Sequence, residues 1–355
     1  MFARFFRHDG TNFNLLFATQ EIISYDYTKR WTKAGDFTLT LPYQKEYIRK
    51  LLLNDFIEYD GEWLFVENIQ YDMQKIVISG HDCKQLIYLR VSALGSLSDQ
   101  FDGTTGTTAQ CIYYFLNRNI ISPADSERTI PLAFNANNVM GLLSDGYMTK
   151  LENIGDIVEK LCNVAGIGYD VKANLSHNRF DFTLKNTVNK SYNQSENTRV
   201  IFAAERQNVT AIEFEHDENN LYNAINATGA GTIEVVYRDN SNIPQGILRR
   251  ECTVDVNVNS VSEIRKTALY AVEDNIDTKT YNLRVPAKDY NTKFSLGDIV
   301  SIRDDALYNY FSAVITEVHM NMSAGSHTVE ITLGHQKPKL LNKITHNMLN
   351  GIKKG

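Results

Sequence analysis

The stretch "FTLTLPYQKEYIRKLLLNDFIEYD", Phe37 to Asp60, decides the fold because the passage "YNLRVPAKDYNTKFSLGDIVSIRD", Tyr281 to Asp304, repeats its pattern. Each copy begins with alternating apolar and polar residues, closes that run at a proline and then continues to a Leu-x-Asp. The matching residues are Phe37 and Tyr281, Leu39 and Leu283, Leu41 and Val285, Pro42 and Pro286, Leu53 and Leu296, and Asp55 and Asp298. We therefore predict that one structural unit occurs twice in the chain.

The match between the two copies extends beyond these passages. "FVEN" (Phe65 to Asn68) has a counterpart in "ITEV" (Ile315 to Val318), and "IVISGH", ending at His81, has one in "EITLGH", ending at His335. The two histidines could form a catalytic pair. Duplication of the unit explains their equivalent places more simply.

Residues 1–92 alternate apolar and polar side chains in short runs, which is typical of strands with one buried face. "AGD" (Ala34 to Asp36) and "DG" at Asp60 supply turns between these strands. The segment "YQKEYIRKLL" predicts a short helix after Pro42. The residues expected to face inward from it are Tyr47, Ile48, Leu51 and Leu52. We predict a small β-barrel or sandwich here, with Leu41 and Val285 on the buried faces of equivalent strands.

The pattern changes after about residue 92, where "LGSLSDQFDGTTGTTAQ" forms a connection rich in glycine, serine and threonine. Thr107 or Thr108 can cap a helix through "AQCIYYFLNRN". "LENIGDIVEKLCNVAG" has apolar residues at helical spacing before Gly166 ends it. The strands "IGYDVKA" and "RFDFTLK" follow, so we predict that the middle region mixes α and β structure.

A polar stretch at 186–198 returns the chain to a second strand-rich region. There "SVSE" (Ser260 to Glu263) fits the capping box of a helix that precedes the second copy. Beyond His335, "KPKLLNKITHNMLNGIKKG" predicts a basic helix that needs a partner. The predicted fold class is mainly β with an α+β insert. The predicted domains are 1–92, a first tube-like β-domain; 93–205, a mixed α/β domain; 206–336, a second tube-like β-domain; and 337–355, a C-terminal basic helix.

Charge, cysteine content and hydropathy exclude several classes of protein. The 355 residues carry a net charge of −6, whereas a DNA or RNA binder usually presents a basic face. Cys83, Cys111, Cys162 and Cys252 stand far apart with no Cys-x-x-Cys pair, which indicates reduced, mostly buried thiols. Arginines interrupt the aromatic N-terminus, and no apolar run approaches the length of a membrane span. We expect synthesis in a cytoplasm and no stable membrane anchor.

Three motifs invite a chemical reading, and each has a simpler one. "ATGAGT" (Ala227 to Thr232) lacks the lysine of a phosphate loop and is better explained as a hairpin. "FEHDENN" (Phe214 to Asn220) could bind calcium, but its spacing fits no calcium loop, so we expect a solvated acidic turn. Trp31 and Trp63 could serve a sugar-binding surface, although strand cores use aromatic residues as readily. With no nucleophile elbow and no His-Glu-x-x-His, we predict no enzyme and no catalytic, cofactor-binding or metal site.

A duplicated unit has a geometric use in a symmetric assembly. Three chains with two equivalent units each present six similar domains, so a closed threefold ring can carry pseudo-sixfold symmetry. Sheets that continue around such a ring bury edge strands that otherwise invite aggregation. An obligate ring of this kind is expected to bury roughly 2,000 Å² or more at each interface.

The chain resembles the tail-hub proteins of long-tailed bacteriophages, also called tail-tip or baseplate hub proteins. The passages that carry this resemblance are "RWTKAGDFTLTLP" (Arg30 to Pro42), "IVISGHDCKQLIYLRV" (Ile76 to Val91), "IGDIVEKLCNVAGIGYDV" (Ile154 to Val171) and "FSLGDIVSI" (Phe294 to Ile302). The resemblance covers about residues 20–336 and rests on order and pattern. It implies a homotrimer at the distal end of the tail tube, with two β-domains per chain in a pseudo-hexameric ring and the mixed domain outside or below.

The partners that this resemblance implies are the chain itself as a homotrimer, the tail tube or distal tail protein ring, the tape-measure protein, and tail-tip or receptor-binding proteins. DNA would pass the hub only in transit, and the acidic balance suits such a channel. No cofactor is implied.

Two other functions are also compatible with the sequence. The aromatic content suggests a carbohydrate-binding or adhesion module of the tail tip. Longer relatives carry peptidoglycan hydrolase or receptor-binding extensions, which suggests a wall hydrolase. Because this chain stops at Gly355, we expect no wall-degrading activity and expect the basic terminal helix to dock a neighbouring tip protein.

Overall fold

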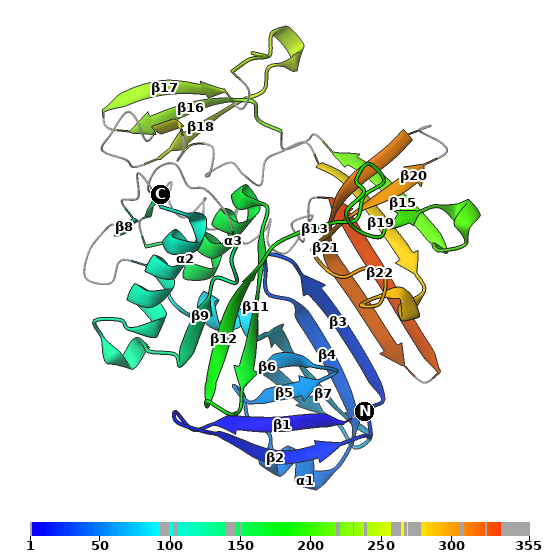
Figure 1. Ribbon diagram of the computed structural model, residues 1–355. Helices are drawn as coiled ribbons and strands as arrows, with labels where there is room; N and C mark the ends of the chain where they lie inside the picture. Colours follow the sequence, from blue (N-terminus) through cyan, green and yellow to red (C-terminus); the bar gives the residue numbers. More distant parts are fainter. Residues whose placement is uncertain are drawn as a thin grey trace.

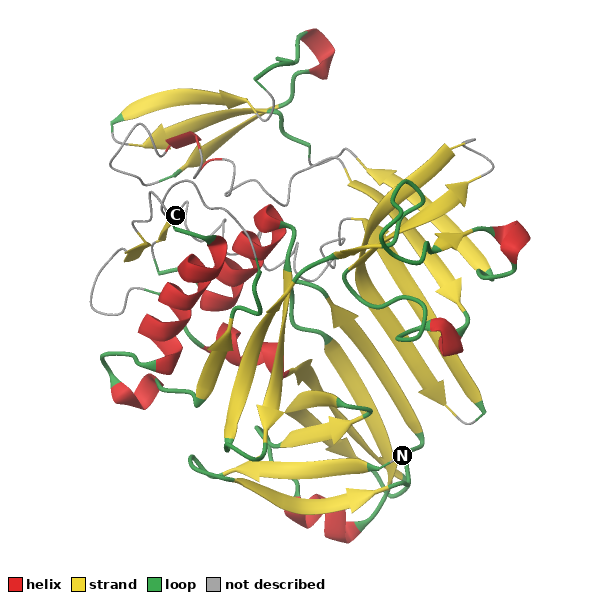
Figure 2. Cartoon of the chain, viewed as in Figure 1, coloured by secondary structure: helices red, strands yellow, loops and turns green. Residues whose placement is uncertain are grey.

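The computed structural model describes residues 2–92, 99–101, 106–139, 147–149, 151–217, 221–229, 231–237, 240–256, 264–265, 268, 278–304, 309–323 and 325–334. Within them strands dominate, and the longer helices lie together beside the middle strands (Figure 2). The predicted fold class, mainly β with an α+β insert, is confirmed. The capping box at Ser260 to Glu263, His335 and the predicted terminal helix at 337–355 lie outside the described residues.

The first β unit is an antiparallel sheet in the strand order β3-β4-β7-β6-β5 (Figure 1). Its strands are β3 (Ser24–Arg30), β4 (Asp36–Pro42), β5 (Phe56–Tyr59), β6 (Glu62–Tyr71) and β7 (Lys75–Asp82). On β4 the side chains of Phe37, Leu39 and Leu41 share the buried face. Between β5 and β6, Asp60 and Gly61 both have positive φ, 53° and 73°, as the tight hairpin requires.

The short helix predicted after Pro42 forms as α1 (Lys45–Lys50). Tyr47 and Ile48 pack against the core of the first β unit, and Leu51 is buried. The prediction that Leu52 faces inward was wrong, because α1 ends before it and Leu52 is 56% exposed in the turn that leads to β5.

The second β unit has the strand order β15-β19-β22-β21-β20, which repeats that of the first unit strand for strand. Its strands are β15 (Ala211–Asp217), β19 (Thr278–Val285), β20 (Asp298–Asp304), β21 (Asn309–Ser323) and β22 (Ser326–Gly334). A bulge interrupts β6 between Val66 and Asn68, and one interrupts β21 between Ile315 and Glu317. Leu41 and Val285, at equivalent places, are 0% and 4% exposed as predicted.

The Leu-x-Asp of each copy performs the same local task. The buried Asp55 accepts the backbone N–H of Leu52 at 2.7 Å, and the buried Asp298 accepts that of Ser295 at 2.7 Å. Each carboxylate also faces a basic partner at 2.8 Å, Arg7 in the first unit and Lys190 in the second. This shared aspartate explains why the repeat is visible in the sequence.

The strand registers correct two matches made from the sequence. The bulges align Val66, rather than Phe65, with Ile315. Phe37 pairs with Gly80 and Tyr281 pairs with Leu333, so the counterpart of His81 is Gly334 rather than His335. The match from the sequence followed the shared glycine and histidine. The alternation of buried residues instead makes Ile78 equivalent to Ile331, because a shift of one residue would move every side chain to the other face.

The two units continue differently beyond their common strands. In the first, β1 (Ala3–His8) pairs antiparallel with β5, and β2 (Phe13–Thr19) follows β1. In the second, β13 (Val188–Asn189) and β14 (Ile201–Phe202) pair parallel with β20. The long path of the sheet therefore ends at β15 on one side and at β2 on the other.

The middle of the chain packs two helices against a three-stranded sheet. Its main elements are η1 (Cys83–Leu89), α2 (Thr108–Leu116), β9 (Leu132–Asn135), α3 (Ile154–Ala165), β11 (Gly168–Asn174) and β12 (Arg179–Lys185). Minor elements are η2 (Asn117–Ile121), η3 (Ser126–Arg128) and the pair β8 (Asp99–Phe101) and β10 (Tyr147–Thr149). Thr107 caps α2 in a capping box, and Gly166, with φ of 65°, ends α3, as expected.

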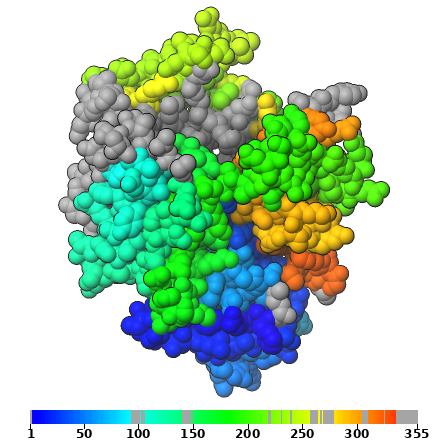
Figure 3. All heavy atoms as spheres, in the orientation of Figure 1, coloured from blue at the N-terminus to red at the C-terminus, as the bar shows by residue number. Residues whose placement is uncertain are grey.

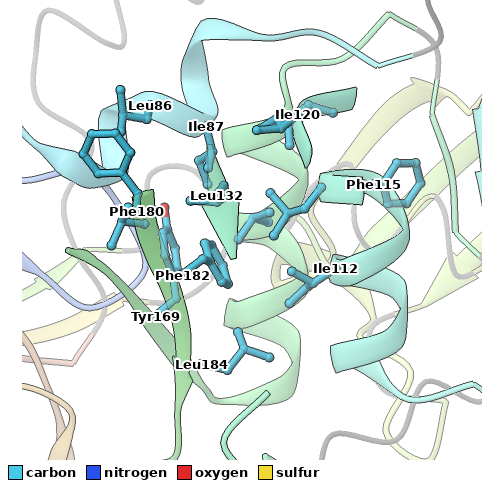
Figure 4. Packing of buried hydrophobic residues seen from close by; sticks show 14 of the residues in the cluster. Leu86, Ile87, Ile112, Phe115, Ile120, Leu132, Tyr169, Phe180, Phe182 and Leu184 are labelled. Carbon is cyan, nitrogen blue, oxygen red and sulfur yellow. The ribbon is translucent and has the colours of Figure 1, made fainter. Parts of the chain in front are cut away.

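The core of this middle region is continuous with the outer face of the first β unit. Figure 4 shows Ile112, Leu132 and Phe182 between the helices and the sheet, and Phe115 belongs to the same buried cluster. Trp63 and Phe65 of β6 belong to the same buried cluster. The middle region is thus attached to the first unit by a shared core.

A further small sheet was not predicted. It consists of β16 (Ala224–Gly229), β17 (Thr232–Tyr237) and β18 (Glu251–Asp255), and lies at the top of Figure 3, in yellow-green. The short turns η4 (Ala204–Arg206), η5 (Gly246–Leu248) and η6 (Ala287–Asp289) complete the described elements. This sheet has its own apolar cluster, so the segment predicted as one domain at 206–336 holds two cores. The four domain limits themselves stay a prediction.

Candidate functional site: the junction between the two β units

The two β units meet edge to edge within the chain. Strand β21 pairs antiparallel with β3, from Glu317 opposite Arg30 to Ser323 opposite Ser24, so that one sheet runs through both units (Figure 1). Just beyond β3, the backbone N–H of Trp31 donates to the carbonyl oxygen of Thr316 at 2.9 Å. This pairing satisfies one edge of each unit and is the contact from which assembly can be argued.

Arg30 ties the two units together by charge. Its Nε lies 2.8 Å from Oε2 of Glu317 in β21, and its Nη2 lies 2.6 Å from Oδ2 of Asp36 in β4. Its Nη1 donates to the carbonyl of Ala34 at 2.8 Å. The side chain is nearly buried, and charge-assisted hydrogen bonds of this kind are the strong ones. The planar guanidinium thereby links Glu317 of the second unit to Asp36 of the first.

Trp31 fills the place where three parts of the molecule meet. A Cβ on Gly168 of β11 would lie 2.3 Å from its ring, and one on Gly297, before β20, would lie 2.2 Å from it. The indole therefore needs a glycine from the middle region on one side and a glycine from the second unit on the other. Its carbonyl also accepts the N–H of Tyr169 at 3.4 Å. This explains why "RWTKAGD" stands out in the sequence.

A buried charge cluster lies beside this contact. Lys84, 1% exposed, donates to the carbonyl of Arg30 and stands 5.0 Å from the ring centre of Tyr169. Burial lowers the pKa of Lys84, and burial raises the pKa of Asp82 to about 6. Burial also acts on Asp170, but Lys29 and Lys185 outweigh it and hold the pKa of this carboxyl below its usual value.

His81 links β4, β6 and β7 through two carboxylates. Its Nε2 lies 3.3 Å from Oδ1 of Asp36, and its Nδ1 is hydrogen-bonded to Oε2 of Glu67. These hydrogen bonds to Asp36 and Glu67 raise the pKa of His81 to about 9. Asp36 also pairs with Arg30, so His81 stabilises the carboxylate that binds the arginine of the junction.

This geometry predicts a pH-dependent stability. Because the folded pKa is raised above 6.5, the contribution of His81 is complete below pH 6.5 and disappears as the pH rises through about 9. The side chain is about one-third exposed, so we expect a loss of only about 1–2 kcal/mol between pH 7 and 10 after allowance for solvent screening. Urea unfolding of the native chain and of His81→Gln across this range measures it. The two proteins should converge at pH 10, and parallel curves would contradict the assignment.

The other residues singled out from the sequence lie apart from the junction or in the core. Trp63 is buried, like Trp31, so neither ring is available to stack on a sugar in this structure. "ATGAGT" forms the predicted hairpin between β16 and β17. The solvated acidic turn expected at Phe214 to Asn220 was wrong, because its residues up to Asp217 lie in strand β15 and the rest lie outside the described ranges. Hydrogen bonding to β19 outweighs the polar composition.

The thiols and the helices agree with the sequence reading where they are described. Cys83, Cys111 and Cys162 are buried and Cys252 is partly buried, and none of the four forms a disulfide. In the part of the chain that the structure covers, no helix has the length and apolar character needed to cross a membrane. The prediction of no catalytic, cofactor or metal residues stays a prediction.

Sequence reasoning missed the residues that make the junction. Arg30 and Trp31 lie in a passage that we had singled out, but nothing in their spacing indicates Glu317, 287 residues away from Arg30. Lys84 looks like an ordinary surface lysine because its partner is a backbone carbonyl. The only usable signal was the pair of glycines, Gly168 and Gly297, each next to a strand.

Comparison with known proteins assigns the chain to a family. Residues 8–238, well over half of the chain, match the family described as Siphovirus ReqiPepy6 Gp37-like protein. The chain belongs to this family. No curated protein sequence matches it. The resemblance to tail-tip and baseplate proteins of long-tailed phages is thereby confirmed.

This chain shares its fold with solved structures of tail proteins whose sequences are distant from it. The tail protein from Neisseria meningitidis MC58 is 13% identical, with 94% of this chain and 96% of that one covered and a TM-score of 0.56. The 43 kDa tail protein of prophage MuSo2 from Shewanella oneidensis is 13% identical, with 93% and 97% covered and a TM-score of 0.54. Prophage tail protein gp18 from Listeria monocytogenes EGD-e is 11% identical over the full length of both, with a TM-score of 0.53.

Proposed function

We propose that this Gp37-like phage tail protein is the hub of the tail tip. Three chains form a ring at the distal end of the tail tube, close the tube and join it to tip proteins. Each chain supplies both β units to the ring, so that a threefold assembly carries six similar domains and can face a sixfold tube. The two units are proposed to descend from one duplicated unit.

One observation carries this proposal. The first and second units have the same strand order, the same bulge and the same buried aspartate, and they stand edge to edge in one sheet through β3 and β21. The edge-to-edge contact of the two units within one chain is an example of the contact between neighbouring domains that a ring would repeat. Chains that repeat this step among themselves remove the strand edges that a single chain leaves exposed.

The proposed partners follow from this position in the particle. They are other copies of the chain, the tail tube or distal tail ring, the tape-measure protein, and tail-tip or receptor-binding proteins. DNA would pass through the ring only in transit, which the net charge of −6 suits because an acidic wall does not hold a phosphate backbone.

We propose that the role is structural and not enzymatic. Two groups with strongly raised pKa values serve the fold. Asp82, whose pKa burial raises to about 6, accepts from the hydroxyl of Tyr27 and from the backbone of Lys84. His81, whose pKa is raised to about 9 by hydrogen bonds to Asp36 and Glu67, bridges these two carboxylates. Zymography on purified cell walls would expose a hydrolase activity if one existed.

The ring predicts a native mass of three chains. Measured by light scattering or native mass spectrometry over a concentration series, the purified protein should shift from monomer to trimer with no stable dimer plateau, because a closed ring makes the contact between chains at every subunit and an open dimer leaves one such contact unmade. Image classes of the trimer should show pseudo-sixfold symmetry. A monomer at every concentration would contradict the proposal.

A further inference from the structure

Within the part of the chain that the structure describes, two strand edges lack the strand neighbour that their counterparts possess. Strand β15 ends the sheet, with β19 on its inner side. Strand β6 is paired with β7 along one edge, while β5 covers its other edge only from Glu62 to Phe65. Among the described strands, none lies beside the outer edge of β6 from Asn68 to Tyr71.

The counterparts of these two edges are paired to each other inside the chain. In the repeated strand order, β21 corresponds to β6 and β3 corresponds to β15. The first part of β21 pairs with β20, as the first part of β6 pairs with β5. Beyond its bulge, β21 pairs antiparallel with β3. The intrachain junction is therefore a template for the missing contact.

We propose that β6 of one chain pairs antiparallel with β15 of a second copy, in the register of the β21–β3 junction. This rests on the proposed ring and names the surface that closes it. Carried over position by position, Glu317 opposite Arg30 becomes Asn68 opposite Asp217, and Met320 opposite Tyr27 becomes Tyr71 opposite Phe214. Between them, His319 opposite Thr28 becomes Gln70 opposite Glu215.

The side chains at these positions fit the proposed register. Tyr71 is 60% exposed and Phe214 is 41% exposed, which is unusual for aromatic residues in sheet strands. Phe214 is already held by Tyr281, with ring centres 4.6 Å apart. Beyond the paired residues, the same count brings Met73, 93% exposed at the hairpin tip, next to Ile212, 37% exposed. Pairing would cover an apolar strip that a lone chain leaves in water.

A polar contact of the template also has a counterpart. In the junction, His319 Nε2 lies 3.0 Å from Oδ2 of Asp26. The equivalent positions hold Gln70 and Glu213, and the amide of glutamine can donate to a carboxylate in the same way. Asp72 would lie opposite Glu213, and this pair of like charges disfavours the contact. The backbone N–H groups of Gln74 and Lys75, which donate to Oδ1 of Asp72 at 2.7 Å and 2.9 Å, offset part of that charge.

The contact is heterologous, because each chain offers β6 to one neighbour and β15 to the other. Such a contact closes into a ring or continues as a filament. Strand β2 also ends the sheet, but it has no counterpart in the second unit and thus no internal template. We therefore choose β6 as the partner of β15, because their counterparts β21 and β3 pair with each other within the chain.

Paired cysteines test the register directly. In a Cys252→Ser background, Gln70→Cys with Glu215→Cys should, on mild oxidation, give covalent dimers and trimers on non-reducing gels. Directly opposite residues of a strand pair bring their Cβ atoms within disulfide range. The matched control is Thr28→Cys with His319→Cys, the template pair, which should form a disulfide within one chain and leave the mass unchanged.

A second control shifts the register by one residue. Gln70→Cys with Phe214→Cys places the thiols on opposite faces of the sheet, so we expect at least tenfold less cross-linked product. A native trimer in which the Gln70/Glu215 pair does not cross-link while the template pair does would overturn the proposed register and leave the hub standing. A monomer at every concentration, with no cross-linked product, would overturn both.

Discussion

Leu41→Asp is expected to destabilise the first β unit by about 4 kcal/mol or more. Leu41 is fully buried in β4, opposite Ile76 of β7, so the change removes a core side chain and places an unpaired carboxylate in an apolar site. Val285→Asp should have a comparable effect in the second unit, because Val285 occupies the equivalent place opposite Val329. Urea or thermal unfolding of the soluble fraction measures both, and we expect most of each variant to be recovered as insoluble protein.

The control for this prediction lies three residues away. Thr38 points to the opposite face of β4 and is partly exposed, so Thr38→Asp should change the free energy of unfolding by less than about 1 kcal/mol. If Leu41→Asp melted like the native protein, the buried face of β4 would be wrongly assigned.

Trp31→Ala is expected to cost about 3–5 kcal/mol, because it empties the space between the middle region, the first unit and the second unit. The substitution should lower the stability of the whole protein and also increase local opening near residue 31. Amide hydrogen exchange should accelerate in β3 at Ser24–Arg30 and in the second half of β21 more than in α2 or α3. Hydrogen exchange followed by mass spectrometry resolves these segments.

Two variants separate the junction from a general loss of core. Trp63→Phe alters the other buried indole, which packs against Phe6 with ring centres 5.2 Å apart, and should leave exchange in β21 unchanged. Gly168→Ala approaches the same contact from the other side, because its Cβ would meet the ring of Trp31 at 2.3 Å. It should reproduce the exchange pattern of Trp31→Ala. Equal exchange in β21 for the native protein and Trp31→Ala would refute the role of Trp31 as a wedge.

Much of the fold could be predicted because the repeat leaves local signals. Alternation gave the strands on either side of Pro42 and Pro286, the Asp60 turn gave the hairpin, and Thr107 and Gly166 marked helix ends. These signals are local, because each depends only on residues that are close together in the sequence. They located the strands, but matching the Gly-His pair in place of the alternation displaced the counterpart of His81 by one residue.

The junction could not be predicted, because the groups that form it are distant from one another in the sequence. Arg30 pairs with Glu317, and Trp31 packs against Gly297, which has no side chain; both partners are distant in the sequence. Lys84 donates to a backbone carbonyl oxygen, which no sequence pattern indicates. The small sheet β16–β18 was missed because its strands were assigned to the second unit by proximity in sequence. Period alone cannot tell two neighbouring sheets from one.

The pairing of β3 with β21 has a consequence for the order in which the molecule is made. Arg30 of β3 precedes Glu317 of β21 by 287 residues, and β21 is complete only at Ser323, so the outer edge of β3 stays unpaired during synthesis until Ser323 has been added. Contacts of such long sequence separation form late and slowly. The first unit and the middle region, which share a core, can mature before the second unit arrives. The two β units can therefore join only after β21 has been synthesised through Ser323.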